Sequence, residues 1–278
     1  MGGGDTAQAV NRRPVALTIA GSDSGAGAGV QADLKTFAAL GVYGTSAITA
    51  VTAQNTVAVR AIHCLPPEIV AAQIDAVFED FEVGAVKIGM LGAPEIVEVV
   101  AAALARWKPP FVVYDPVLAA STGGALAREG LLVALKQGLI AEVDLLTPNL
   151  AEAGALLGVA PAMNEDSMQA QGRALLALGP RAVLMKGGHL EGDAVDWLLA
   201  ADLEQRFGAP RVAAANTHGT GCTLSSAIAA HRLRGLSLVE SVRLAKAFTR
   251  DAILAARSER LGRGAGPLMQ WPLGPAKT

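Results

Sequence analysis

Short apolar runs alternate with amphipathic stretches along most of this chain. Compact runs of apolar and β-branched residues predict buried strands, and apolar positions three and four residues apart predict helices. The predicted strands are 15–20, 45–51, 85–88, 111–114, 144–146 and 182–185. The predicted helices are 31–40, 67–79, 94–107, 127–136, 150–157, 165–178, 221–233 and 238–256. A β-rich stretch over 194–212 has the turn signals of antiparallel hairpin strands.

Regular alternation of strands and helices predicts the fold class. Such a pattern indicates parallel βαβ units, whose sheet is covered by helices on both faces. The expected architecture is therefore α/β, with a mostly parallel central sheet in a three-layer α/β/α sandwich. Neither a composition shift nor a repeat divides the chain, so we expect one domain over 14–278 after a flexible leader, 1–13. In such sheets the ligand lies beyond the carboxyl ends of the strands.

Composition narrows the class of protein. The chain is 51% hydrophobic with 31 glycines, enough for a large core, and its net charge is −2. Without a basic block, nucleic acid and an anionic membrane surface are not expected partners. The only two cysteines, Cys64 and Cys222, argue against a disulfide framework and suit a reducing cytosol. No uninterrupted apolar run approaches the roughly 18–20 residues that cross a bilayer. A cytoplasmic enzyme is the expectation.

The segment Asn216–Thr223 carries the strongest chemical signal. Gly219 and Gly221 allow a sharp turn that points successive N–H groups at one spot, just where a helix is predicted to begin. A helix N-terminus of this kind binds anions, phosphate above all. Cys222 lies in that field, so we expect its thiol to lose its proton more easily than a free thiol. The alternative is an ordinary glycine-rich turn, with Cys222 as a small buried hydrophobe.

Three further loops follow predicted strands. The glycine-rich loop that begins at Gly21 fits neither a P-loop nor a dinucleotide fingerprint. It would instead let backbone approach a substrate, while Asp33 aims a carboxylate at it or, alternatively, caps a helix and faces solvent. Gln54 lies in an uncharged polar loop suited to a neutral heterocycle. Met90 could lay an adaptable side chain on a ring, although a core role is the default.

A second set of residues suits a nucleotide and its metal. Asn149 and Glu152 are three apart at a helix start, where they could hold Mg²⁺ through its water shell or simply cap the helix. Lys186 ends a strand before two glycines and is suited to nucleotide phosphates. Asp115 adds a carboxylate at another strand end.

These motifs together resemble the hydroxymethylpyrimidine/phosphomethylpyrimidine kinase family of thiamine biosynthesis, within the ribokinase-like superfamily. The similarity runs in order from Val15 to Gly266, and the most specific motifs are Gln-Ala-Asp-Leu-Lys-Thr, Ala-Gln-Asn-Thr and His-Gly-Thr-Gly-Cys. The resemblance implies a three-layer α/β/α domain that uses ATP and Mg²⁺. The sequence departs from the family at Leu118 and Ala119, where many relatives have Met and a longer residue. The resemblance therefore does not define how the 118–124 loop contributes to the pocket.

The resemblance also implies a role for each matched residue. Gln54 would bind the aminopyrimidine, with Asp33, Gly21 and Met90 in the pocket. Cys222 would be the base, and Gly219 and Gly221 would supply anion-binding amides. Residues expected to contact ATP are Lys186, Asn149 and Thr220. Those expected at the metal are Glu152, Asn149 and Asp115.

The implied reaction transfers phosphate from ATP to 4-amino-5-hydroxymethyl-2-methylpyrimidine, and then to its monophosphate to give the diphosphate. A pyridoxal or pyridoxine kinase is the first alternative, because pyridoxal also offers a ring hydroxymethyl group. A non-catalytic nucleotide- or vitamin-binding protein is the second. Relatives suggest a homodimer.

Overall fold

A single nine-stranded sheet forms the centre of the molecule in the computed structural model, which describes residues 13–118, 129–188 and 190–271. The strand order is β3-β2-β1-β4-β5-β6-β7-β8-β9. Strands β1, β2, β4, β5, β6 and β7 pair in parallel, whereas β3, β8 and β9 join antiparallel. The strands are β1 (Val15–Asp23), β2 (Tyr43–Gln54), β3 (Val59–Cys64), β4 (Val83–Ile88), β5 (Val112–Tyr114), β6 (Leu145–Leu146), β7 (Ala182–Lys186), β8 (Ala194–Ala200) and β9 (Leu203–Ala209).

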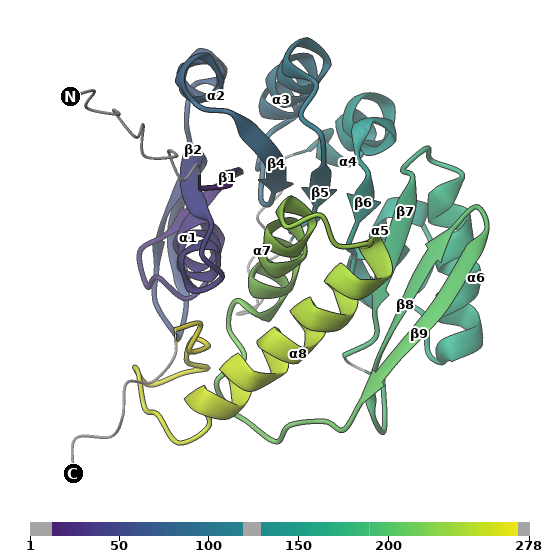
Figure 1. The fold of residues 1–278 in the computed structure, drawn as a ribbon. Coiled ribbons are helices and arrows are strands. Elements are labelled where there is room, and N and C mark those ends of the chain that lie inside the picture. The colour runs from purple at the N-terminus through teal and green to yellow at the C-terminus, as the bar shows by residue number, and fades with distance from the viewer. Residues whose placement is uncertain (1–12, 119–128, 189, 272–278) are drawn as a thin grey trace, which may run out of the picture.

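Helices cover both faces of this sheet, which confirms the predicted three-layer α/β/α class (Figure 1). One face carries α2 (Pro67–Asp80), α3 (Pro94–Trp107), α4 (Leu131–Ala134), α5 (Leu150–Leu157) and α6 (Glu165–Leu176). The other carries α1 (Gly29–Ala39), α7 (Thr220–Leu233) and α8 (Leu238–Ala256). Each face has its own buried apolar cluster, centred on Ile88 and Leu146 on the first and on Val113 and Ile228 on the second. The parallel strands alternate between the two clusters, so both layers are held by the same sheet.

Three strands differ from the prediction. Strand β2 runs from Tyr43 to Gln54 instead of over 45–51, so Gln54 ends a strand and does not lie in the loop expected for it. Strand β1 continues to Asp23 instead of ending before the glycine-rich segment, because its pairing with β2 resumes after a register shift between Ala20 and Ser22. Strand β3 was not predicted at all. It lies at the sheet edge with most of its side chains exposed. Polar residues such as Arg60 and His63 therefore interrupt it, and it lacks the apolar run that predicts a buried strand.

The helix predicted over 127–136 is wrong in extent. The described part begins after Gly130, whose φ of 82° cannot continue a right-handed helix, and runs through α4 into a π-helical turn, Leu135–Leu139, and a 3-10 turn, Ile140–Glu142. The beginning of that predicted helix, the leader up to residue 12, and positions 119–124 lie outside the described residues.

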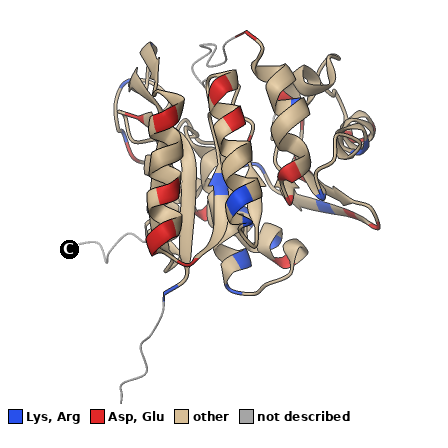
Figure 2. Ribbon diagram, turned by 90° about the horizontal axis from the view of Figure 1, so that it is seen from above, with Lys and Arg blue, Asp and Glu red and all other residues tan. Residues whose placement is uncertain are grey.

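Lys, Arg, Asp and Glu of both signs are spread over the helices in Figure 2. Within the described residues, no helix is long and apolar enough to cross a membrane.

Candidate active site

The candidate residues meet at the carboxyl ends of β1, β4, β5 and β7, around the first turn of α7. Gly219 has a φ of 86°, and a Cβ on it would lie 1.9 Å from the carbonyl oxygen of Gly27. Only glycine allows this contact, which joins the glycine-rich loop after β1 to the start of α7. A Cβ on Gly221 would lie 3.1 Å from Asp115 Oδ2 and 3.2 Å from Lys186 Nζ. The helix end therefore faces a carboxylate–ammonium pair on the neighbouring strands.

The first turn of α7 has the form of an anion-binding site. The N-cap residue is Gly219, and within the described chain no side chain caps this end. The first N–H groups of a helix lack intrahelical partners and carry the positive end of the helix dipole. A phosphate placed here would be met by backbone donors, with Lys186 beside them.

The expectation of an easily ionised Cys222 is wrong for this structure. Cys222 is 8% exposed. Burial raises the pKa of its thiol to about 11, and the negative charges of Asp33 and Asp115 act in the same direction. The ammonium of Lys87 and the backbone of Gly29 offset only part of that rise. Desolvation is the largest effect on this group, so the thiol is neutral at pH 7.

Asp33 does not point toward an open pocket, and it does not face solvent either. The residue is fully buried, and its Oδ2 accepts hydrogen bonds from Lys87 Nζ at 2.8 Å and from Thr18 Oγ1 at 2.6 Å. Its Oδ1 accepts one from Ser226 Oγ at 2.8 Å. Ser226 lies one helical turn after Cys222, so this carboxylate ties α1 and β4 to the underside of α7. Both oxygens are occupied by protein groups.

Lys87 is the buried cation of this cluster. Burial alone would favour the neutral amine, but the negative charges of Asp33 and Asp115 and the hydrogen bond to Asp33 raise the pKa of Lys87 above its usual value. It stays an ammonium beneath the thiol that the sequence singled out.

A second charged cluster joins the ends of β5 and β7 to α5. Lys186 Nζ lies 2.5 Å from Asp115 Oδ1 and 3.9 Å from Glu152 Oε2. Burial raises the pKa of Glu152 to about 7; Lys186 opposes this rise and Asp115 adds to it. A carboxyl group whose pKa is raised in this way marks a place where added positive charge would be favourable.

Asn149 and Glu152 form the helix cap that was one of the two alternatives. Asn149 Oδ1 accepts from the Glu152 N–H at 2.9 Å, and Glu152 Oε2 accepts from the Asn149 N–H at 2.8 Å. This reciprocal pair is a complete capping box at α5. Among the residues that the structure describes, no cluster of three or more His, Cys, Asp or Glu could hold a metal by itself. The donor set still fits Mg²⁺, which commonly takes one or two carboxylates and completes its shell with water and substrate phosphates.

The two roles of Glu152 can be separated by substitution. Glu152→Gln keeps a side-chain acceptor for the capping box but removes the charge, so we expect an almost unchanged melting temperature. If the carboxylate acts on the metal, the Mg²⁺ concentration for half-maximal rate should rise by about tenfold. Titrating the rate with MgCl₂ measures this.

The capping box of α6 supplies the control. Asn164→Ala removes a similar cap at the start of α6, where Asn164 pairs with Ser167, and should cost about 1 kcal/mol of stability with no change in Mg²⁺ requirement. An unchanged Mg²⁺ requirement in Glu152→Gln would leave capping as its whole role.

Gln54 ends β2 next to the start of α7. Ser24 Oγ holds its backbone, accepting from the Gln54 N–H at 2.8 Å and donating to the Gln54 carbonyl at 2.6 Å. The side-chain amide lies between Thr52 Oγ1 at 3.2 Å and His218 Nε2 at 3.3 Å. His218 in turn lies 2.8 Å from Asp23 Oδ2. His218, which immediately precedes the anion-binding turn, therefore contacts Gln54, the residue expected to bind the ring.

Met90 and Gly21 lie against each other. A Cβ on Gly21 would be 2.6 Å from Met90 Cε, so this glycine makes room for the methionine. Met90 is buried in a small cluster with Ala50, against which Cys64 and Val117 also pack. Met90 is therefore a core residue at the edge of the candidate site, which was its default interpretation.

Sequence reasoning did not single out Asp23, Lys87 or His218. Asp23 and His218 lie inside segments described above, but a single sequence does not pair residues that are 195 positions apart. The signal that could have found Lys87 is its place in an otherwise apolar strand. Thr220, expected at the nucleotide, donates its hydroxyl to the Thr217 carbonyl at 2.7 Å.

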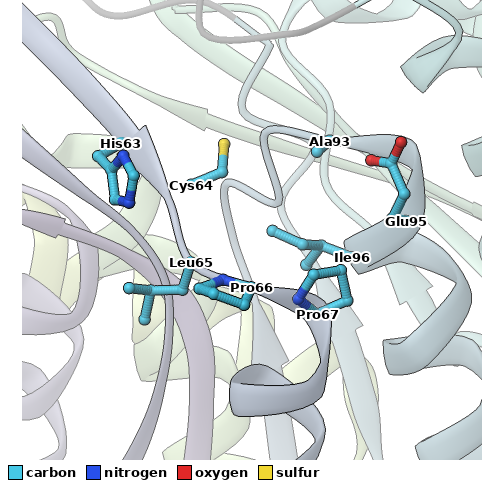
Figure 3. A pocket seen from close by; sticks show the side chains of 8 residues that line it. All are labelled: His63, Cys64, Leu65, Pro66, Pro67, Ala93, Glu95 and Ile96. Atoms are coloured by element: carbon cyan, nitrogen blue, oxygen red, sulfur yellow. The ribbon is translucent and has the colours of Figure 1, made fainter.

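A cavity of about 240 Å³ lies beside this site, between the end of β3 and the starts of α2 and α3. It is lined by His63, Cys64, Leu65, Pro66, Pro67, Ala93, Glu95 and Ile96 (Figure 3). None of the residues predicted for catalysis or binding lines it. Cys64 is its link to the site, through the packing against Met90.

Comparison with known proteins agrees with this geometry. The family model for phosphomethylpyrimidine kinase matches residues 23–269. The hydroxymethylpyrimidine/phosphomethylpyrimidine kinase of Salmonella typhimurium is 52% identical over 254 residues, which cover 91% of this chain and 96% of that protein. The crystal structure of phosphomethylpyrimidine kinase from Clostridium difficile 630 aligns with a TM-score of 0.77 at 43% identity, covering 87% of this chain and 100% of that one. Bacillus subtilis pyridoxal kinase, solved as an ADP complex, aligns with a TM-score of 0.85 at 32% identity, covering 93% and 98%.

The fold and the site together define a small-molecule kinase of the ribokinase-like class. Within that class, the chain belongs to the phosphomethylpyrimidine kinase family.

Proposed function

We propose that this protein phosphorylates 4-amino-5-hydroxymethyl-2-methylpyrimidine with ATP and then phosphorylates the monophosphate to the diphosphate, in thiamine biosynthesis. Membership of the family supports the reaction class and the substrate class. The observation that carries the proposal is that the segment His218–Gly219 both touches Gln54 and begins α7. The amide that we assign to the ring therefore lies beside the helix end that we assign to phosphate, which supports transfer to a ring substituent.

Phosphoryl transfer depends mainly on positioning and on charge neutralisation. We assign the N–H groups of Gly219 and Gly221 to the transferred group and Lys186 to the ATP phosphates, with Thr220 and Asn149 at the edge of the nucleotide site. Cys222, in its thiolate form, takes the proton of the substrate hydroxyl and becomes a neutral thiol. Asp33 does not contact substrate in this scheme; it holds Lys87 beneath the thiol.

ATP as the donor follows from kinase family membership, and the ADP complex of the Bacillus subtilis pyridoxal kinase supports a nucleotide site in this fold. We propose that Glu152 and Asp115, with Asn149 at the helix cap, face Mg²⁺ through its waters. When bound, Mg²⁺ would neutralise phosphate charge. Lys186 moves no proton in this scheme and serves as a fixed positive charge.

Pyridoxal is the second candidate substrate, because pyridoxal kinases of this fold align over nearly the whole chain. A non-catalytic binding protein is the less favoured alternative, given the family to which the chain belongs. An assay that couples ADP release to a spectroscopic signal, with hydroxymethylpyrimidine, its monophosphate and pyridoxal in parallel, decides among the three. We expect turnover on both pyrimidines and a lower kcat/KM on pyridoxal. ADP release on pyridoxal alone, or on none of them, would contradict the proposal.

Gln54 is expected to select the substrate. An aminopyrimidine presents a donor amine beside an acceptor ring nitrogen, and a carboxamide offers the matching acceptor and donor. Gln54→Leu leaves both ring groups without their partners, at a combined cost of roughly 1.4–3.5 kcal/mol, so kcat/KM for hydroxymethylpyrimidine should fall about tenfold to a few hundredfold. Any activity on pyridoxal, which lacks this edge, should fall much less. Equal losses on both substrates would mean that Gln54 only holds its loop.

A homodimer and a cytoplasmic location complete the proposal. Family membership and the absence of a membrane-spanning helix from the described residues are compatible with both. Sedimentation of the purified protein would determine the oligomeric state.

A further inference from the structure

The C-terminal segment, Gly262–Gln270, follows α8 and is drawn in yellow in Figure 1. One end of it lies on Thr56, in the turn that joins β2 to β3 just after Gln54. Thr56 Oγ1 accepts hydrogen bonds from the N–H groups of Arg263 at 3.2 Å and Gly264 at 3.1 Å. A Cβ on Gly264 would lie 1.9 Å from the Thr56 carbonyl oxygen, well inside van der Waals contact. The segment therefore approaches the turn after β2 as closely as only a glycine allows.

The same segment is bonded to the chain on both sides of the start of α7. The carbonyl of Gly266 accepts from the His218 N–H at 3.1 Å, and the Gly266 N–H donates to Asn216 Oδ1 at 3.0 Å. A Cβ on Gly266 would lie 2.3 Å from that oxygen. Further along, Gln270 Nε2 donates to Thr223 Oγ1 at 3.1 Å. The anion-binding turn lies between these two attachments.

Alpha-helix α8 anchors the segment independently of both loops. Asn216 is buried, and its Nδ2 donates to the carbonyls of Ala256 at 2.6 Å and Glu259 at 2.7 Å, at the end of α8. The Met269 N–H donates to the Ala252 carbonyl at 3.2 Å. Because α8 packs on the sheet through its own apolar residues, the segment has a fixed support from which to hold its two neighbours.

The two regions that the segment contacts have different tasks in the proposed reaction. The turn after β2 carries Gln54, which we assign to the ring, and the start of α7 is assigned to the transferred phosphate. Transfer requires the two reacting atoms to be held at close approach, and a misplacement of about 1 Å can lower a rate about 100-fold. We infer that the C-terminal segment sets the spacing between the ring-binding turn and the phosphate-binding helix end, with Gly264 and Gly266 as its positioning residues. This inference rests on the proposed function for the identity of the two ligands.

A spacer of this kind acts on transfer more than on the affinity of either ligand. The contact at Gly264 bears on the ring side, whereas Lys186, assigned to the ATP phosphates, ends β7 on another part of the sheet. The contact at Gly266 bears on the helix side and leaves the bonds between Ser24 and the Gln54 backbone in place. A change at either glycine should therefore lower kcat, and each should leave the KM of the ligand at the opposite end nearly unchanged.

Two alanine variants test the spacer. Gly264→Ala forces the Thr56 carbonyl away, so we expect kcat for hydroxymethylpyrimidine to fall about tenfold to 100-fold while KM for ATP changes less than about threefold. Gly266→Ala displaces the buried Asn216 side chain and should lower kcat on a similar scale, with KM for the pyrimidine changing less than about threefold. Gly138→Ala is the matched control with wild-type kcat, because a Cβ there meets nothing within 4 Å.

Thr56→Val keeps the test decisive if an alanine variant folds poorly. It removes the acceptor of two N–H groups with little change of shape, and it should lower kcat about threefold to tenfold. Melting temperatures are measured beside the kinetics. Wild-type kcat in the folded Gly264→Ala and Thr56→Val proteins, with or without a lower melting temperature, would show that the segment only stabilises the fold and would overturn this inference alone. A wild-type protein inactive on hydroxymethylpyrimidine would overturn the proposed function together with it.

Discussion

Replacing Lys87 with methionine is expected to lower the free energy of unfolding by about 3–5 kcal/mol, because it leaves a buried carboxylate without its counter-charge. Lys87 and Asp33 both have side chains with 0% exposure, and their charged atoms lie 2.8 Å apart. The pKa of Lys87 is raised on folding, so its contribution is full below the unfolded value near 10.5 and is lost only in more alkaline solution. Urea denaturation at pH 7 therefore measures it in full.

Two controls make this result specific. Adding Asp33→Asn to the Lys87→Met protein removes the stranded charge and should recover part of the loss, since a neutral amide can still bond to Thr18 and Ser226. Arg106→Met breaks an exposed ion pair with Asp75 and should change stability far less. A Lys87→Met protein as stable as the wild type would mean that the ion pair contributes little to stability and does not hold α7 in place.

The alternation of apolar and amphipathic segments was enough to predict the layers of this fold, because strands that are buried on both faces of a parallel sheet consist of nearly continuous apolar runs. It failed where burial is weak. Strand β3 is an exposed edge, and the segment after Gly130 depends on a glycine in the left-handed region rather than on periodicity. Both features are set by tertiary contacts that no local window contains.

Motifs located the site but not the state of its groups. The sequence placed Cys222 at a helix N-terminus, and it is there, yet the expected sign of its pKa shift was wrong. The helix dipole could be predicted from the local sequence, whereas the desolvation of Cys222 is caused by chain segments far away in the sequence. Asp33 shows the same limit, because its partners Lys87 and Ser226 are 54 and 193 positions away. Spacing along one helix gave capping as one of two interpretations of the Asn149–Glu152 pair, and the capping box is present because capping is local.

Cys222→Ala is expected to lower kcat by about 100-fold or more, the usual scale for loss of a general base, with little change in KM for the pyrimidine. The side chain is small and buried, so the variant should remain folded. Cys64→Ala, which removes the other thiol at the edge of the site, is the matched control and should keep kcat close to that of the wild type.

The raised pKa of Cys222 gives this prediction a second observable. Because the thiol pKa is about 11, the reactive thiolate is a small fraction at pH 7 and grows about tenfold with each pH unit up to that value. If Cys222 is the base, kcat of the wild-type protein should rise between pH 7 and 10, and Cys222→Ala should lose the rise. Lys87 is the group that holds the thiol pKa down, so Lys87→Met, where folded, should shift the same rise to higher pH. A pH profile that stays the same in Cys222→Ala would show that another group takes the proton, and Cys222 would then be the small buried residue of the alternative interpretation.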